Sequence, residues 1–143
     1  MNAIMAGRTI SIIAAILIGA GDIGLAGGTI YVDRDATGAN NGSSWANAYN
    51  SVQDALADAG LRAKPVEIRV AQGIYRPDEG AGITPGDRTV AFGMINGVTI
   101  RGGYAGFGEA NPDARDITGY ETVLSGDLDS NFYVITVGFL FGL

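Results

Sequence analysis

The sequence contains no cysteine and no histidine among its 143 residues. Without thiols there is no disulfide framework, no cysteine nucleophile and no thiolate zinc site, and without imidazoles the commonest general base is missing. A metal site in this chain would therefore have to be built from oxygen ligands.

Basic residues are also scarce. Nine Lys and Arg stand against 15 Asp and Glu, which gives a net charge of −6, and no basic run occurs anywhere in the chain. Because proteins that bind nucleic acid depend on clustered Lys and Arg, we do not expect nucleic acid as a partner. The hydrophobic fraction of 47% fits one modest domain with its own core.

The segment "ILIGAGDIGLAGG" at 16–28 contains a G-x-G-x-x-G pattern at Gly19, Gly21 and Gly24. In a dinucleotide site this pattern opens a helix that holds the pyrophosphate at its N-terminus. Here only four residues separate Gly24 from the strand-like run that begins at Thr29, so the helix has no room.

A secretory signal peptide over residues 1–26 accounts for more of this segment. Arg8 supplies the n-region charge, residues 10–20 form the apolar h-region, and Gly24 and Ala26 are the small residues before a cleavage site. An uncleaved membrane anchor is the alternative, but the apolar run falls short of the roughly 20 residues that span a bilayer. We expect cleavage after Ala26, a secreted or cell-surface location, and no stable membrane span after cleavage.

In the mature segment 27–143, one short helix and several short strands are expected. Ser51 is a predicted N-cap with Asp54 three residues on, and Gly60 is the predicted stop, so the helix covers 51–59. The predicted apolar stripe of this helix consists of Val52, Ala55, Leu56 and Ala59. Strands are predicted at 29–33, 66–71, 89–92, 97–104, 122–125 and 132–137, separated by Gly-rich loops. The pattern fits a coil of stacked parallel rungs, and it also fits an antiparallel sandwich.

Several motifs in this order resemble those of a known family. They are "IYVDRDATGANNGSSWANAYNSVQDALADA", "EIRVAQGIYRPDE", "RTVAFGMINGVTIRGGYAGFGE", "ARDI" and "TVLSGDLD". Together they resemble the N-terminal region of secreted bacterial right-handed parallel β-helix proteins of the pectin-lyase-like superfamily. The resemblance covers Ile30 to about Asp129, nearly the whole mature chain.

The resemblance implies an all-β fold, the first few rungs of a right-handed parallel β-helix. Residues 51–59 would then be a capping helix over the open end of the coil, and 66–71, 98–101 and 122–125 would belong to early rungs. Gly102 and Gly103 would form a tight corner where the backbone leaves a strand. Proteins of this family continue into many further rungs, whereas this chain stops after "NFYVITVGFLFGL". We therefore expect the β-helix to be incomplete at the C-terminus.

Two sets of residues are candidate binding sites. Trp45 and Tyr49, flanked by Asn47 and Asn50, are candidates for stacking on a sugar, although an aromatic pair just before a helix is also typical of core packing. A separate set of oxygen ligands at alternate positions begins like a calcium loop, but Phe132 and Gly138 stand where such a loop has its Gly and its last acidic ligand, and a turn between rungs explains the same residues. That set comprises Asp127, Asp129 and Asn131.

No catalytic or cofactor-binding residue is assigned, and calcium is the one cofactor considered. The acidic pairs Asp33 with Asp35 and Asp113 with Asp116 lie in polar, turn-rich sequence where solvated carboxylates are the default. Arg101 is interpreted as a solvent-facing or loop-pairing arginine. These observations favour an exported structural or binding module without catalysis, whose partners would be polysaccharide or other cell-envelope components. The alternative is the N-terminal fragment of a polysaccharide lyase or glycoside hydrolase.

Overall fold

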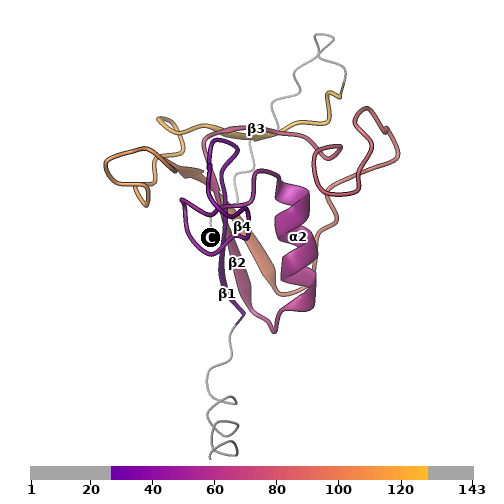
Figure 1. Ribbon diagram of the computed structural model, residues 1–143, viewed down its shortest axis with the longest axis horizontal. Coiled ribbons are helices and arrows are strands. Elements are labelled where there is room, and N and C mark those ends of the chain that lie inside the picture. Colours follow the sequence, from indigo (N-terminus) through magenta and orange to yellow (C-terminus); the bar gives the residue numbers. More distant parts are fainter. Residues whose placement is uncertain (1–26, 129–143) are drawn as a thin grey trace, which may run out of the picture.

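The structure, a computed structural model, describes residues 27–128. In this part of the chain the strands form two parallel sheets, one with the order β1-β2-β4 and one that pairs β3 with β5 (Figure 1). The elements in chain order are β1 (Gly28–Val32), α2 (Val52–Leu61), β2 (Val66–Ala71), β3 (Gly73–Tyr75), β4 (Val98–Tyr104) and β5 (Thr122–Leu124).

The three-stranded sheet is held in register by apolar residues at every second position. Ile30 pairs with Ile68, and Ile68 pairs with Ile100. Successive side chains of a strand point to opposite faces, so these residues share one face of the sheet. Ile30 and Ile68 are fully buried, and Ile100 packs against the same cluster from the edge strand β4.

Helix α2 covers this apolar face (Figure 1). The Ser51 Oγ accepts a hydrogen bond from the Asp54 N–H at 3.1 Å, which confirms the predicted N-cap. The buried residues of the helix are Val52, Ala55, Leu56 and Ala59, the predicted apolar stripe. They belong to the same core cluster as Ile30 and Ile68. The helix continues through Gly60, the predicted stop, and ends at Leu61.

The expectation of an all-β right-handed parallel β-helix is wrong. Residues 27–128 form a small mixed arrangement of one helix and two short parallel sheets, and neither sheet closes or winds into a solenoid. The predicted capping helix does not lie over the end of a coil. It lies in the crossover between the parallel neighbours β1 and β2, where a connection of this length is needed, and its apolar stripe is part of the core.

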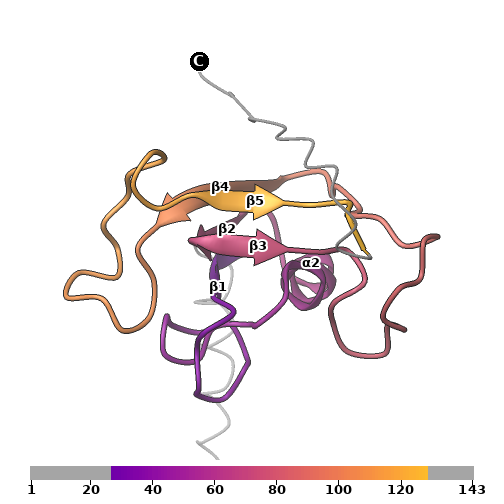
Figure 2. The same cartoon turned by 90° about the horizontal axis from the view of Figure 1, so that it is seen from above.

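The predicted strands correspond only in part to the observed ones. Those expected at 29–33, 66–71, 97–104 and 122–125 match β1, β2, β4 and β5. Residues 98–101 and 122–125 do not form successive rungs of one sheet, because β4 pairs with β2 whereas β5 pairs with β3. Figure 2 shows β3 and β5 side by side. Residues 89–92 form no strand, and 132–137 lie outside the described residues.

Gly102 and Gly103 do not form the expected corner, because β4 continues through both of them to Tyr104, and of the two only Gly103 has a left-handed torsion, with φ +88°. A Cβ at this position would lie 2.9 Å from Ile117 Cγ2, and one at Gly102 would lie 2.7 Å from Thr122 Cβ. Both glycines are therefore needed where β4 passes close to the segment that leads into β5.

The sequence predicts a signal peptide followed by a mature segment, and the structure describes only part of the second. The predicted signal peptide, residues 1–26, lies outside the described residues, and the segment 27–143 is described as far as residue 128. Within 27–128, none of the helical structure has the length and hydropathy that a membrane span requires.

We expect Ile68→Ala to lower the free energy of unfolding by about 2–5 kcal/mol, because it leaves a cavity at the centre of the sheet–helix interface. The matched control is Ile74→Ala, since the Ile74 side chain is 45% exposed whereas Ile68 is 0% exposed. The control should change the free energy by less than about 1 kcal/mol. Urea denaturation of both variants measures this, and equal losses would contradict the assigned core.

Candidate functional site

The face of the three-stranded sheet that lies opposite α2 is polar. The strand register places Thr29, Glu67 and Thr99 in one row across β1, β2 and β4. The next row on the same face contains Tyr31, Arg69 and Arg101. We call these two rows the outer face. All six side chains are at least partly accessible to solvent, so this face is available to a ligand.

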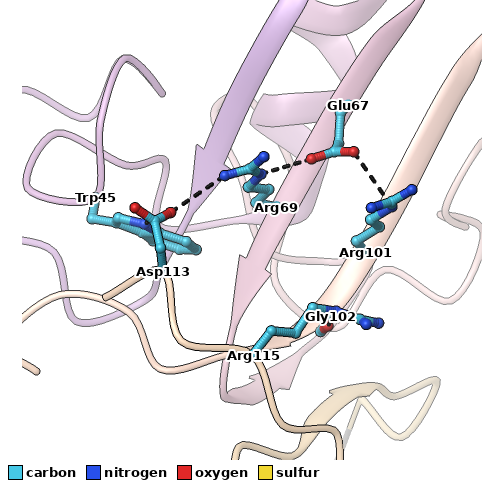
Figure 3. Close-up of polar contacts among 7 residues, drawn as sticks. All are labelled: Trp45, Glu67, Arg69, Arg101, Gly102, Asp113 and Arg115. Atoms are coloured by element: carbon cyan, nitrogen blue, oxygen red, sulfur yellow. Dashed lines mark hydrogen bonds and ion pairs between the residues drawn. The ribbon is translucent and has the colours of Figure 1, made fainter. Parts of the chain in front are cut away.

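Glu67 lies at the centre of a charge network on the outer face (Figure 3). Its Oε1 accepts a hydrogen bond from Arg69 Nε at 2.6 Å, and its Oε2 lies 3.3 Å from Arg101 Nε. The hydrogen bond to Glu67 raises the pKa of the Arg69 guanidinium. Ion pairs this exposed contribute at most about 1 kcal/mol each, so the network orients its side chains more than it stabilises the fold.

The network continues from the sheet to a loop (Figure 3). Arg69 Nη1 lies 3.3 Å from Asp113 Oδ1, and the same oxygen accepts a hydrogen bond from Trp45 Nε1 at 3.0 Å. Arg115, two residues further along the loop, donates from Nε to the Gly102 carbonyl at 2.9 Å. The loop between β4 and β5 therefore places both an acidic and a basic side chain beside the outer face.

An aromatic cluster borders the same face. The Trp45 ring lies 4.9 Å from the Tyr31 ring and 5.5 Å from the Tyr104 ring, centroid to centroid. The guanidinium groups of Arg69 and Arg115 lie 5.5 Å and 5.8 Å from the Tyr104 centroid, within the range of cation–π attraction. The Tyr104 ring therefore lies near two guanidinium groups: that of Arg69, in the second row, and that of Arg115, in the loop after β4.

The structure places the two predicted sugar-stacking residues in different clusters. Trp45 is 8% exposed, and it packs with Tyr31, Tyr104 and Ala71. Tyr49 packs against the core under α2, and its hydroxyl donates a hydrogen bond to Asp58 Oδ2 at 3.2 Å. Burial, together with the neighbouring Asp58 carboxylate, raises the pKa of the Tyr49 hydroxyl.

An open groove of about 360 Å³ crosses the beginning of the three strands. Four residues of the outer face line it: Thr29, Glu67, Arg69 and Thr99. The remaining lining residues are Gly28, Pro65 and Val66. The groove therefore follows the first row of the outer face and reaches Arg69 of the second row.

Asp33 anchors the loops around this site. It is 2% exposed, its Oδ1 accepts from the Asp35 N–H at 2.9 Å, and its Oδ2 accepts from the Phe107 N–H at 2.6 Å. Burial raises the pKa of this carboxyl group against the opposing effect of these two hydrogen bonds. With both oxygens engaged by the backbone, Asp33 holds the loop after β4 against the end of β1.

The remaining acidic residues considered from the sequence occupy separate places. Asp35 is exposed. Hydrogen bonds from the backbone N–H groups of Thr118 and Gly119 hold the pKa of Asp116 below its usual value.

Of the calcium candidate, Asp127 is described. Asp127 donates its N–H to Ser125 Oγ at 3.1 Å, and its carbonyl accepts from Arg76 Nε at 2.8 Å. The other two members of the calcium candidate, Asp129 and Asn131, lie outside the described residues. Within 27–128 no group of three acidic side chains is arranged to hold a metal ion.

The outer-face network was not identified as a site from the sequence, although a signal for it exists. The alternation in "VEIRVA" places Glu67 and Arg69 on the wet face of β2. The partners Arg101 and Asp113 are separated from Glu67 by more than thirty residues, so only the strand register and the loop after β4 reveal the network.

Comparisons of the chain with models of protein families, with curated proteins and with solved structures find no match. The resemblance to pectin-lyase-like proteins therefore stays a prediction from the sequence. What the site can do has to be argued from its own geometry.

We expect Asp33→Ala to lower the free energy of unfolding by about 2 kcal/mol at neutral pH, because the backbone N–H groups of Asp35 and Phe107 lose a charged acceptor. A raised pKa means that the folded chain binds the proton more tightly than the unfolded chain does. The wild type should thus gain stability relative to Asp33→Ala as the pH falls from neutral through the folded pKa. Urea denaturation across this window measures the difference, and a penalty that shrinks on acidification would contradict the assignment.

Proposed function

We propose that this chain is an exported, non-catalytic module that binds polysaccharide of the cell envelope on the outer face of its three-stranded sheet. The observation that carries the proposal is the in-register alignment of hydroxyl, carboxylate and guanidinium side chains across β1, β2 and β4. Four of these residues, Thr29, Glu67, Arg69 and Thr99, line an open groove.

The spacing of the rows suits an extended sugar chain. Neighbouring strands lie about 4.8 Å apart, so a row that crosses three strands extends over about 10 Å, the length of a disaccharide. Hydroxyl groups recur along a glycan at similar intervals. Thr29 on β1 and Thr99 on β4 each offer a hydroxyl that can donate and accept, and Glu67 on β2 offers carboxylate acceptors.

The charge network favours recognition of hydroxyl groups. The Glu67 carboxylate and the Arg69 guanidinium are both planar, and the hydrogen bond between them sets their relative orientation. Each of these groups can contact two adjacent atoms of a ligand at once. A side chain that is already ordered loses less conformational entropy when a ligand binds. The Arg101 side chain is 54% exposed and retains N–H groups for a ligand beyond its contact with Glu67.

The same contacts argue against glycoside hydrolysis at this site. That reaction needs a pair of carboxyl groups, one of which has a raised pKa so that it carries a proton. Both oxygens of Glu67 already contact arginines, and Glu67 is the one carboxylate among the described residues that line the groove. The carboxyl with a raised pKa, Asp33, is buried with both oxygens engaged by backbone N–H groups.

Export is tested by expressing the full chain in a bacterial host and sequencing the N-terminus of the product outside the cytoplasm. We expect the product to begin at Gly27, because Gly24 and Ala26 present small side chains to the peptidase. An Ala26→Lys variant should block processing at that bond. Full-length product in the cytoplasm for both chains would contradict export.

Binding is tested by electrophoresis of the full chain through gels that contain a soluble β-glucan, a polyuronate or no polysaccharide. At least one polymer should retard the wild type. Glu67→Gln should weaken that binding by about tenfold or more, because it removes a charged acceptor and the partner that orients both arginines.

Glu109→Gln is the matched control for this test, since Glu109 is an exposed loop residue outside the groove. It should bind like the wild type. Retardation that is equal in all three chains, or absent with every polymer, would contradict the proposal.

A further inference from the structure

Two Asn-Gly dipeptides occur in the described part of the chain, Asn41-Gly42 and Asn96-Gly97. In this dipeptide the glycine backbone nitrogen can attack the asparagine Cγ, because no side chain on the glycine obstructs the approach. The C–N bond to the side-chain amide breaks, ammonia leaves, and a cyclic imide forms. Water then opens the imide at either carbonyl to give aspartate or isoaspartate. The two dipeptides are identical in sequence, so a tenfold difference between their rates in the native chain comes from the fold.

Asn41-Gly42 is held by the loop that borders β1. The Asn41 Oδ1 accepts from the Ser43 N–H at 3.1 Å, so the side-chain amide is fixed in a turn. The attacking atom is also engaged, since the Gly42 N–H donates to the Asn47 carbonyl at 2.8 Å. The Gly42 carbonyl accepts from the Tyr31 N–H at 3.0 Å, which joins this dipeptide to the sheet.

The packing around Gly42 adds to this restraint. Gly42 is buried with φ +71°, and a Cβ on it would lie 2.7 Å from the Tyr49 ring and 2.8 Å from Ile30 Cγ2. Rotation of the Asn41-Gly42 peptide toward the imide geometry would break hydrogen bonds on both sides of the dipeptide. The reaction at Asn41 therefore requires local opening of the loop.

Asn96-Gly97 lies in an open turn just before β4. Both residues are exposed, and the turn is closed by the Val98 N–H, which donates to the Ile95 carbonyl at 3.1 Å. Gly97 has φ +78°, the value expected at the third position of a type II turn. Within residues 27–128, neither the Asn96 side chain nor the Gly97 N–H forms a hydrogen bond.

We propose that Asn96 is a covalent modification site of the native chain, at which spontaneous deamidation produces aspartate and isoaspartate, whereas the fold protects Asn41. This inference does not rest on the proposed binding function. It follows from the contrast between a glycine nitrogen that is hydrogen-bonded and buried and one that is free and exposed.

Isoaspartate at position 96 has a structural consequence. It inserts one extra backbone carbon directly before Gly97, whose carbonyl accepts from the Val66 N–H at 3.0 Å at the start of the β2–β4 pairing. Val66 and Thr99 line the groove on this part of the sheet. Modification at Asn96 would loosen the first residues of this pairing and leave the dipeptide at Asn41 unchanged.

The test is incubation of the full chain at mildly alkaline pH, followed by cleavage after arginine and mass spectrometry. Asn96 is the sole asparagine in the peptide Thr89–Arg101, so deamidation there is assigned directly. Asn41 lies in the peptide Asp35–Arg62 and is located by fragmentation. In the native chain Asn96 should react at least about tenfold faster than Asn41, because the reaction at Asn41 occurs only from the opened loop.

The same incubation in urea is the control, because both dipeptides are then unfolded and their rates should agree within about threefold. Asn96→Gln should abolish the deamidation of the peptide 89–101 and leave the rate at Asn41 unchanged. Equal rates at Asn41 and Asn96 in the native chain would overturn the proposal. So would an Asn96 that reacts in urea but not in the native chain.

Discussion

The parallel register of β1, β2 and β4 is the constraint on which the rest of the molecule depends. It aligns Ile30, Ile68 and Ile100 on one face and, in the same step, aligns Tyr31, Arg69 and Arg101 on the other. A shift of one residue in β2 would exchange its two faces and turn Glu67 and Arg69 into the core, where uncompensated charges are very costly. The core and the candidate site are therefore two results of one alignment.

Helix α2 shows why an amphipathic pattern does not by itself locate an element. Its N-cap at Ser51 and its apolar stripe are local features, and the sequence predicted both correctly. Whether such a stripe covers the end of a coil or the face of a sheet depends on which strands pair around it, and this is a tertiary property. The crossover from β1 to the adjacent parallel strand β2 places the helix on the sheet face that carries Ile30 and Ile68. The helix is therefore part of the core, whereas an all-β core with the helix at its end was expected from the sequence.

The strands were predictable where alternation and burial coincide, as in Val66–Ala71. Strand β3 was missed because it is only three residues long and begins at Gly73, with φ +136°, in a segment rich in glycine. Residues 89–92 have strand-forming side chains but no pairing partner within 27–128, so propensity alone did not produce a strand there. Trp45 was recognised as a candidate, yet its neighbours are distant in the sequence, and no local pattern reveals them: Tyr104 ends β4, and Asp113 lies in the loop that follows.

The outer-face network adds little to stability, yet it orders the side chains on which the proposed polysaccharide binding depends. Glu67 is shared by two arginines, and Asp113 Oδ1 is shared by Arg69 and Trp45, so few carboxylate oxygens order several donors. In solvent each ion pair is worth little, and the fold would tolerate its loss. An ordered set of donors nevertheless reduces the loss of side-chain conformational entropy on binding, because the arginines are already held in place before the ligand arrives. A surface that gains little stability from its own ion pairs can therefore still be well ordered to bind a hydroxyl-rich chain, as proposed.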